Sequence, residues 1–534
     1  MMNRLLIVCT IVLLVLTNCN KDDNDNSPEP IVPIEFTIAA DSIKVNPYGF
    51  TPLSALVNFT SEKEGRTYVK VYGKYGAFSD VTHLFNDFGT LHSIPVIGMY
   101  ANSANTVDIR ILNATGDTLE KSTIVITTQV LPADMPVSIT SLPFTENSVE
   151  EGFDLVSSLS TRGIPNRPSI PYMVDDYGDV RWVLDYSGNV ELKDMFYDDG
   201  IARLRNGNFY FANITTNKIY EVGLLGEIID TWSMPGYSFH HNVQEKPNGD
   251  FLVSVSKDGS TNTQGHVTIY DYIIEINRQS KSITKEWDLK ESLDEYRRTL
   301  IADAGDWIHV NSVDYDSTDN TIIVSGRTQG VFKIDYDNNV KWILSPHSGW
   351  GNNRRGEDLN NYLLTPIDAN GNPYIDSNIA IGTASAADFE WCFYQHSNIF
   401  LPDGNLMVFD NGTTRTLNDP EGNNVNNSAP GKYSRAVEYK IDETNMTIQQ
   451  VWTYGKERDQ SCYSSIISSV QYLPETNHIL FSPGYNVLNT TGSGGKIVEI
   501  DYATKQVVAE TSISSANSFG FHRAKKINPY PDNL

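Results

Sequence analysis

The stretch FYQHSNIFLPDGNLMVFDNG, residues 393–412, reads as a strand, a turn and a second strand. Apolar residues alternate with polar ones on both sides of the turn Asp403-Gly404-Asn405, which is the pattern of a β-hairpin. A histidine, His396, stands just ahead of the first strand. Because related hairpins recur along the chain, this stretch indicates the fold of most of the protein.

Two kinds of hairpin alternate from residue 172 onward. One is an apolar strand, a polar turn and an apolar strand that often ends at Trp, and it occurs at 172–185, 219–234, 272–289, 331–344, 436–454 and 496–513. The other begins with a polar lead-in and occurs at 198–213, 239–256, 307–327, 394–412 and 468–484. Residues 518–533 repeat only its lead-in and first strand.

Two hairpins per repeat give four strands, and four-stranded modules repeated around a ring form a β-propeller. We therefore predict an all-β protein with a six-bladed β-propeller over residues 136–534, in which strands from both chain ends share a blade. An irregular stack of hairpins is the alternative. Residues 34–135 lack the repeat but alternate with period two, as in RTYVKVYGK at 66–74, which predicts a small β-sandwich.

The first 19 residues, MMNRLLIVCTIVLLVLTNC, contain one Arg, an apolar run and a Cys. The run has signal-peptide length and is short of the roughly 20 apolar residues of a spanning helix. VLTNC resembles the lipobox of bacterial lipoproteins, although Asn18 replaces the usual small residue. We expect lipidation of Cys19, an acidic and Pro-rich tether at 20–33, and membrane anchoring in the periplasm, at the outer membrane or at the cell surface. Simple secretion is the alternative.

The chain is acidic, with a net charge of −26 and a pI near 4.7. This argues against a nucleic-acid partner, since phosphate binding needs a basic surface. Outside the leader only Cys392 and Cys462 remain, and they form either a disulfide or two buried thiols.

Three of the 10 histidines, His241, His309 and His396, stand at the start of the hairpins with polar lead-ins. His241 and His396 each lie eight residues before the turn glycine, Gly249 or Gly404. Because the innermost strands of a propeller line its channel, we expect the three imidazoles to converge at one mouth of that channel. For any one of them alone, a buried structural histidine is the simpler interpretation.

Arg327 ends the third hairpin of this kind and is either a site residue or part of an ordinary salt bridge. His240, His522 and Asn411 are the candidate substrate contacts. His240 directly precedes His241, so strand alternation predicts that its side chain points the other way. His522, in the incomplete last repeat, could reach the same mouth. A long insertion at 347–392 leads into the last of the three histidines, and long loops on rigid scaffolds are often functional.

Three His and one Arg allow two kinds of chemistry. Three imidazoles can coordinate a zinc ion. However, a guanidinium nearby would repel a metal and no Cys or carboxylate partner is evident, so no metal is expected. Alternatively, the planar fork of Arg matches oxyanions such as sulfate or phosphate. A neutral His can then act as a nucleophile, while another His protonates the leaving oxygen.

Several segments in order resemble the bacterial arylsulfate sulfotransferases that do not use phosphoadenosine phosphosulfate. They are FHHNVQEKPNGDFLV (239–253), DWIHVNSVDYDSTDNTIIVSGRTQGVFKID (306–335), SPHSGW (345–350), YLLTPID (362–368) and QHSNIFLPDGNLMVFDNG (395–412), with HSIPVIGMYANSANTV (92–107) in the first domain. The resemblance implies a small β-sandwich followed by a six-bladed propeller. It also implies ping-pong transfer of a sulfuryl group from a phenolic sulfate ester to a phenol, without any cofactor. A homodimer is compatible with this family.

The same resemblance places His396 at the position of the family's nucleophile, which becomes a sulfohistidine. His241, His309 and Arg327 match its other catalytic positions. Asn242 departs from the family, which often has Asp there, and Ser397 is a second departure. The rival hypotheses are a non-catalytic surface propeller that binds a glycan or a peptide, a metal-dependent propeller hydrolase, and an aryl sulfatase.

Overall fold

A computed structural model describes residues 32–534 except 161–166, 300–302, 419–430 and 515–519. The predicted leader, its Cys19 and most of the tether lie outside the described residues. The regular secondary structure of the described chain is nearly all strand, with one short α-helix, α1 (Ser377–Ile381), which confirms the all-β class. No helix in the described part is both long and apolar enough to cross a lipid bilayer.

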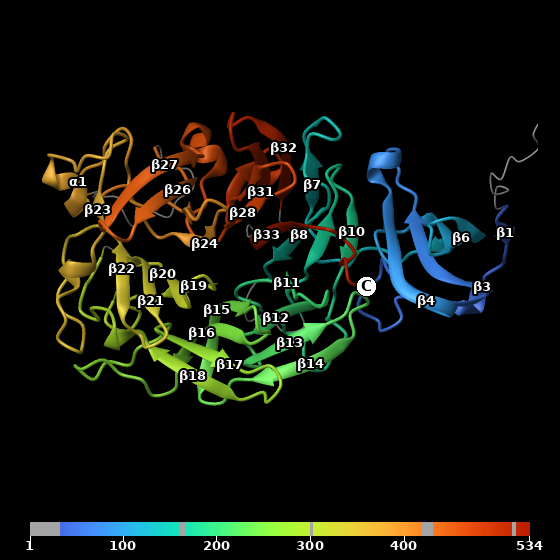
Figure 1. Cartoon of the computed structure of the whole chain (residues 1–534), viewed down its shortest axis with the longest axis horizontal. Coiled ribbons are helices and arrows are strands. Elements are labelled where there is room, and N and C mark those ends of the chain that lie inside the picture. Colours follow the sequence, from blue (N-terminus) through green and yellow to red (C-terminus); the bar gives the residue numbers. More distant parts are fainter. Residues whose placement is uncertain (1–31, 161–166, 300–302, 419–430, 515–519) are drawn as a thin grey trace, which may run out of the picture.

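The N-terminal domain is a six-stranded sheet at one end of the molecule (Figure 1). Its strands are β1 (Ile34–Glu35), β2 (Ile43–Val45), β3 (Ala55–Val71), β4 (Val81–Val96), β5 (Ala104–Leu112) and β6 (Thr118–Thr127). The long strand β3 pairs with β2 through its first part and with β5 through its last part. Both parts pack on one apolar core that includes Val57 and Val69.

The rest of the chain forms six sheets, each built on four antiparallel strands. The first sheet contains β8 (Phe153–Ser158), β9 (Tyr172–Val174), β10 (Val180–Val183) and β33 (Phe521–Ile527). The second contains β11 (Ala202–Arg203), β12 (Phe209–Asn213), β13 (Lys218–Val222) and β14 (Ile228–Ser233). The third contains β15 (Tyr237–Glu245), β16 (Phe251–Lys257), β17 (Tyr272–Ile276) and β18 (Ile283–Asp288).

The remaining three sheets follow the same plan. The fourth contains β19 (Val310–Asp316), β20 (Thr321–Gly326), β21 (Gly330–Asp335) and β22 (Val340–Leu344). The fifth contains β24 (His396–Phe400), β25 (Leu406–Asp410), β26 (Arg435–Asp442) and β27 (Thr447–Tyr454), with β23 (Thr365–Pro366) at its edge. The sixth contains β28 (Ser469–Leu473), β29 (His478–Ser482), β31 (Gly492–Asp501) and β32 (Val507–Ser514), with β7 (Ser138–Ser141) and β30 (Val487–Asn489) added. The 3-10 segments are η1 (Ala40–Ser42), η2 (Ala77–Ser79), η3 (Leu289–Glu291), η4 (Leu359–Tyr362) and η5 (Lys456–Cys462).

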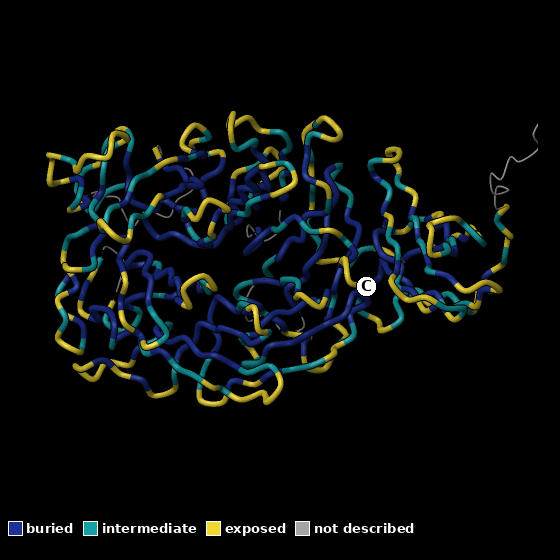
Figure 2. The backbone as a smooth tube through the Cα atoms, viewed as in Figure 1, coloured by how far each residue is buried: buried dark blue, intermediate teal, exposed yellow. Residues whose placement is uncertain are grey.

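The hairpins predicted from the repeats are all present, and the reasons lie in the sequence pattern. Gly249 and Gly404 adopt φ values of 89° and 84° in their turns, a conformation that glycine reaches without a steric penalty. The Trp of the outer hairpins is buried between neighbouring sheets: Trp287 of β18 packs with Phe332 of the next sheet. Figure 2 shows buried strands toward the middle of this domain and exposed loops around its rim.

Both ends of the larger domain contribute to one sheet, as predicted. β33 comes from the incomplete last repeat and pairs antiparallel with β8, with Ile527 opposite Phe153. The first strand of each sheet contacts that of the next, from β15 to β19, β24, β28 and β33. Cys392 and Cys462 are two buried free thiols, so the disulfide alternative is excluded.

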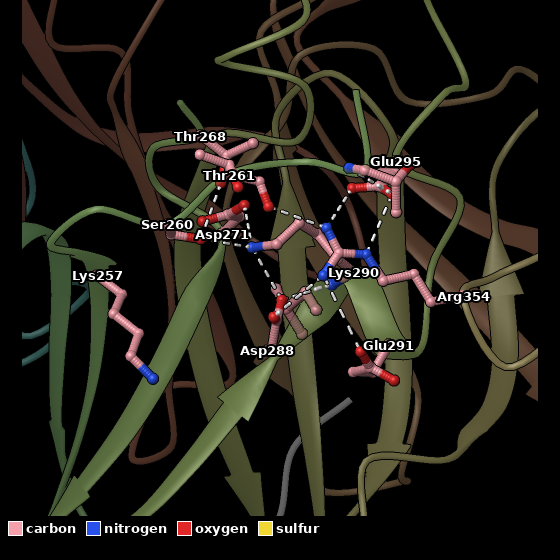
Figure 3. Close-up of polar contacts among 12 residues, drawn as sticks. Lys257, Ser260, Thr261, Thr268, Asp271, Asp288, Lys290, Glu291, Glu295 and Arg354 are labelled. Carbon is pink, nitrogen blue, oxygen red and sulfur yellow. Dashed lines mark hydrogen bonds and ion pairs between the residues drawn. The ribbon is translucent and has the colours of Figure 1, made fainter. Parts of the chain in front are cut away.

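A network of buried charges supports the connection between β18 and β19 (Figure 3). Lys290 Nζ is fully buried, 2.8 Å from Asp271 Oδ2 and 2.9 Å from Asp288 Oδ1. Arg354, from the long insertion, pairs with Glu295 at 2.7 Å. The insertion is thus tied to this connection by an ion pair.

The same network positions residues that lead into the next inner strand. Asp271 Oδ2 also accepts a hydrogen bond from Trp307 Nε1, at 3.1 Å. The Trp307 carbonyl in turn accepts from Thr328 Oγ1 at 2.7 Å and from Gln329 Nε2 at 2.6 Å. Because Trp307 lies two residues before His309, these bonds fix the backbone from which that imidazole projects.

Replacing Lys290 with Met tests this support. The change leaves Asp271 buried without its cation, and removal of one partner of a buried pair destabilises by about 3–5 kcal/mol. The free energy of unfolding of the larger domain, from urea titration, should fall by that amount. Lys257→Met is the matched control, because Lys257 is 41% exposed and pairs with Glu286 at the surface. It should cost less than about 1 kcal/mol. Equal losses of unfolding free energy in Lys290→Met and Lys257→Met would contradict the structural role of Lys290.

Candidate active site

Four inner strands carry a β-bulge at or next to a histidine. The register shifts lie between Phe239 and Val243, Val310 and Ser312, His396 and Asn398, and Phe521 and Ala524. His241 and His309 themselves have φ values of 60° and 53°, which is uncommon for residues other than glycine. A bulge re-aims a side chain. The four strands can therefore turn their imidazoles toward one point.

These strands bring together five imidazoles, which we call the histidine cluster: His240, His241, His309, His396 and His522. His241 Nε2 lies 3.2 Å from His309 Nε2, and His522 Nε2 lies 3.3 Å from His241 Nδ1. The rings of His241 and His396 are 5.8 Å apart. All are buried except His309, which is slightly exposed. The histidines singled out from the sequence therefore converge.

The prediction that His240 points away from His241 is wrong. The left-handed backbone at His241 breaks the alternation of the strand, so the neighbouring rings lie 3.9 Å apart. His240 stacks on Tyr270, and its Nε2 lies 3.3 Å from His309 Nε2. Its Nδ1 lies 2.8 Å from Asp198 Oδ2.

The proton position on His396 follows from its partner Asn411. Asn411 Nδ2 donates to the carbonyls of Ser464 and Ile467, at 2.8 and 3.0 Å. Its Oδ1 must then face His396 Nδ1, 2.7 Å away, and can only accept a hydrogen bond. The imidazole therefore carries its proton on Nδ1 and leaves a lone pair on Nε2. That atom receives only a long contact from the Ile467 N–H, at 3.3 Å.

Burial favours the uncharged form of four of the five imidazoles. It lowers the pKa values of His241, His309 and His396 below the usual histidine value, because a buried imidazolium loses its hydration. Burial and the neighbouring Arg523 lower the pKa of His522 to about 3. Neutral imidazoles can act as nucleophiles and bases at neutral pH.

Two carboxylates complete the cluster, and neither was found from the sequence. Asp306 Oδ2 lies 2.7 Å from His309 Nδ1, which directs that proton and leaves His309 Nε2 facing the other rings. Burial alone would raise the pKa of Asp198, but the imidazoles of His241 and His240 hold it well below its usual range.

The register of the repeat held a signal for one of these acids, Asp198. Asp199 lies eight residues before Gly207, the same spacing that separates His241 from Gly249. Asp198 directly precedes Asp199, so its position in this repeat corresponds to that of His240 in the repeat that forms the third sheet. An acid takes the histidine position in this repeat, so a search for histidine alone missed it.

The departures Asn242 and Ser397 hold strands together. Asn242 Oδ1 accepts from the Val313 N–H at 2.9 Å, and its Nδ2 donates to Asp199 Oδ2 at 2.9 Å. Ser397 has a φ of 52° and accepts a long hydrogen bond from the Val470 N–H, at 3.4 Å. Both therefore bridge neighbouring sheets.

Arg327 is a buried cation beside the cluster. Burial lowers the pKa of its guanidinium, and the nearby Asp306 carboxylate partly offsets this. The Arg327 backbone N–H donates to the His309 carbonyl at 3.0 Å, which places it beside the cluster. Within the described part of the chain, its buried Nε has no hydrogen-bond partner and its guanidinium forms no ion pair. Arg327 also borders a pocket with Tyr394 and Gln395, which directly precede His396. An unpaired buried donor of this kind is suited to an oxyanion.

The arrangement can therefore hold an anionic group between a guanidinium and an imidazole with a directed lone pair. A second imidazole, His309, is hydrogen-bonded through Nδ1 to the carboxylate of Asp306 and can exchange a proton at Nε2. These parts suit covalent transfer of an anionic group through a histidine.

Comparisons with known proteins point to the same chemistry. Residues 142–522 match the family model described as Arylsulfotransferase (ASST), and residues 42–129 match the one described as Arylsulfotransferase Ig-like domain. The chain is 31% identical to the arylsulfate sulfotransferase AssT of Escherichia coli O6:H1 (strain CFT073), over 91% of this chain and 92% of that protein. AssT of Lelliottia amnigena gives the same identity and coverage. A virginiamycin B lyase structure from Staphylococcus aureus aligns with a TM-score of 0.33 and 10% identity over 71% of this chain and 88% of that one, which is too weak to carry an argument.

Arg327→Ala tests the anion site with inorganic sulfate as the probe. Loss of charge-assisted hydrogen bonds worth about 1.5–3 kcal/mol should weaken sulfate binding about 10- to 100-fold. Isothermal titration calorimetry measures the change. Arg278→Ala is the control, because Arg278 is already paired with Glu221 and Glu245 and should leave sulfate binding unchanged. Undiminished binding to the Arg327 variant would refute the assignment.

Proposed function

The chain belongs to the arylsulfotransferase family and is an aryl sulfotransferase, and on this premise we propose that it works by a ping-pong mechanism through a sulfohistidine at His396. A phenolic sulfate ester is the donor and a phenol is the acceptor. Two observations carry the proposal: Asn411 fixes a lone pair on His396 Nε2, and the buried Nε of Arg327 has no hydrogen-bond partner among the described residues.

In the first half-reaction, His396 Nε2 attacks the sulfur of the bound ester. The N–S bond forms as the bond from sulfur to the aryl oxygen breaks, and a phenolate leaves. Arg327 offsets the negative charge on the sulfuryl oxygens throughout, as a fixed donor that needs no reorganisation. Asn411 stabilises the positive charge that develops on the ring, because its Oδ1 accepts from Nδ1–H.

The departing phenolate needs a proton. His309 can supply it from Nε2 when its ring carries two protons, a form that burial disfavours and that Asp306 stabilises through Nδ1–H. In the second half-reaction, the acceptor phenol returns a proton to His309 and its oxygen takes the sulfuryl group from His396. His241 lies between these two rings and is assigned to the sulfuryl oxygens. His240 and His522 are assigned as substrate contacts at the edge of the cluster.

We further propose that the six sheets close into a six-bladed propeller over residues 136–534, with a β-sandwich at 34–135. The sequence of contacts between first strands and the sheet shared by β8 and β33 support closure. Arg203 of β11 also donates to the carbonyls of Asn528 and Pro529, just beyond β33. Such a ring directs the first strand of every sheet toward the axis.

His396→Ala tests the nucleophile. Without a phenol, wild-type protein should release about one equivalent of phenolate from a chromogenic aryl sulfate. Continuous release should require an added phenol, with no nucleotide present. The variant should lose this release entirely, because no other step can begin without the N–S bond. His266→Ala is the control, since His266 is exposed and outside the cluster. Full turnover by a folded His396 variant would refute the assignment.

The same assay separates the rival functions. Continuous release over many turnovers without an acceptor indicates an aryl sulfatase. Absence of release from folded wild-type protein, whichever donor is used, indicates a binding module for a glycan or a peptide.

The membrane location is proposed from the sequence alone. We infer that the chain is exported, lipidated at Cys19 and held at a bacterial membrane by the tether at 20–33. Cys19→Ala should shift the protein from the membrane fraction to the soluble extracytoplasmic fraction on immunoblots of fractionated cells. An unchanged distribution would argue against the lipid anchor.

A further inference from the structure

We propose that His240, His241 and His309 form a binding site for a divalent transition-metal ion such as Zn²⁺, and that occupancy blocks sulfuryl transfer. The site lies on the side of the histidine cluster that faces Asp198. It is separate from the nitrogen of His396 that attacks sulfur.

The spacing of the three ring nitrogens suits a tetrahedral ion. Nε2 of His309 lies 3.2 Å from Nε2 of His241 and 3.3 Å from Nε2 of His240. The candidate ligand atoms of all three residues lie within 4.8 Å of one another. Zinc–nitrogen bonds of about 2.0–2.1 Å in a tetrahedron separate two ligand nitrogens by roughly 3.3 Å. The rings therefore need only small shifts to hold the ion.

Each of the three imidazoles also has an oxygen near its Nδ1, within hydrogen-bond geometry for His309 and His241 and at ion-pair distance for His240. His309 Nδ1 lies 2.7 Å from Asp306 Oδ2, and His240 Nδ1 lies 2.8 Å from Asp198 Oδ2. His241 Nδ1 lies 3.3 Å from the Asp198 carbonyl oxygen. Metal-binding histidines nearly always donate their second N–H to a carboxylate or a carbonyl in this way. Protons on Nδ1 leave three Nε2 lone pairs converging on one point, which favours a shared proton or a cation there.

The charges answer the objection raised from the sequence. That objection was a nearby guanidinium and the lack of a carboxylate. Asp198 and Asp306 supply two negative charges directly behind the imidazoles, enough to balance a dication. Arg327 borders the pocket of Tyr394 and Gln395, and although its charge acts on His309, the effect is smaller than that of Asp306.

Occupancy has a direct chemical consequence, which rests on the proposed mechanism. A metal takes the Nε2 lone pairs of His309 and His241, and these atoms are assigned to proton exchange and to the sulfuryl oxygens. Turnover should therefore stop while metal is bound and return when a chelator removes it. Metal binding itself does not depend on the proposed reaction.

Cobalt is the probe for the site, because tetrahedral Co²⁺ has strong visible absorption bands that octahedral Co²⁺ in water lacks. Chelator-treated full-length protein should give this spectrum at one equivalent of Co²⁺, and Zn²⁺ should abolish it by displacement. His240→Ala and His309→Ala should each remove the spectrum. Asp306→Asn should weaken Co²⁺ binding about 10- to 100-fold, as expected for a residue that orients a ligand. His266→Ala, with the exposed histidine changed, should retain the wild-type spectrum.

The outcomes are distinct. No tetrahedral spectrum in folded wild-type protein, or the same spectrum in both ligand variants, would overturn the site. Zn²⁺ that binds with the expected spectrum while phenolate release continues unchanged would overturn the inhibition and leave the site standing. If no donor is turned over at all, the cobalt spectrum still decides the metal site independently of the proposed function.

Discussion

The left-handed backbone at the start of the inner strands is the constraint on which the site depends. His241 and His309 adopt positive φ values, and Ser397 does so directly after His396. Such conformations are costly for residues with a side chain and persist only where the surroundings enforce them. Here the neighbouring sheets enforce them through polar contacts, such as the bond from Asn242 to the Val313 N–H. The four-stranded sheets supply the rigid scaffold, and the bulges at the start of their inner strands orient the imidazoles toward one another.

Charge divides this cluster into two sides. Near Arg327, a guanidinium nitrogen with no hydrogen-bond partner among the described residues favours an anion, and Asn411 leaves His396 Nε2 with a lone pair. Toward Asp198, acidic groups favour a cation or a shared proton. Burial keeps the imidazoles between them neutral and so available to both sides. The same histidine cluster is therefore suited to sulfuryl transfer near Arg327 and, near Asp198, to a metal ion that would inhibit this transfer.

Much of this could be predicted from the sequence, because the hairpins are specified locally. Period-two alternation, turn glycines and buried Trp residues located the strands, and the spacing before Gly249 and Gly404 located the histidines. The direction of His240 could not be predicted, because alternation holds only in a regular strand and a bulge interrupts this one. The position of Asp306 behind His309 depends on a loop with no periodic pattern. The tautomer of His396 depends on carbonyls of the loop that leads into the sixth sheet, which the sequence does not place.

The most direct test of the central claim is to find the covalent intermediate. Protein incubated with an aryl sulfate and no acceptor would be quenched under alkaline conditions, digested and mapped by mass spectrometry. The proposed mechanism predicts one sulfuryl group on the peptide that contains His396, localised to that imidazole and lost when a phenol is added before quenching. A sulfuryl group on another residue, or none in protein that transfers sulfate when a phenol is present, would contradict it.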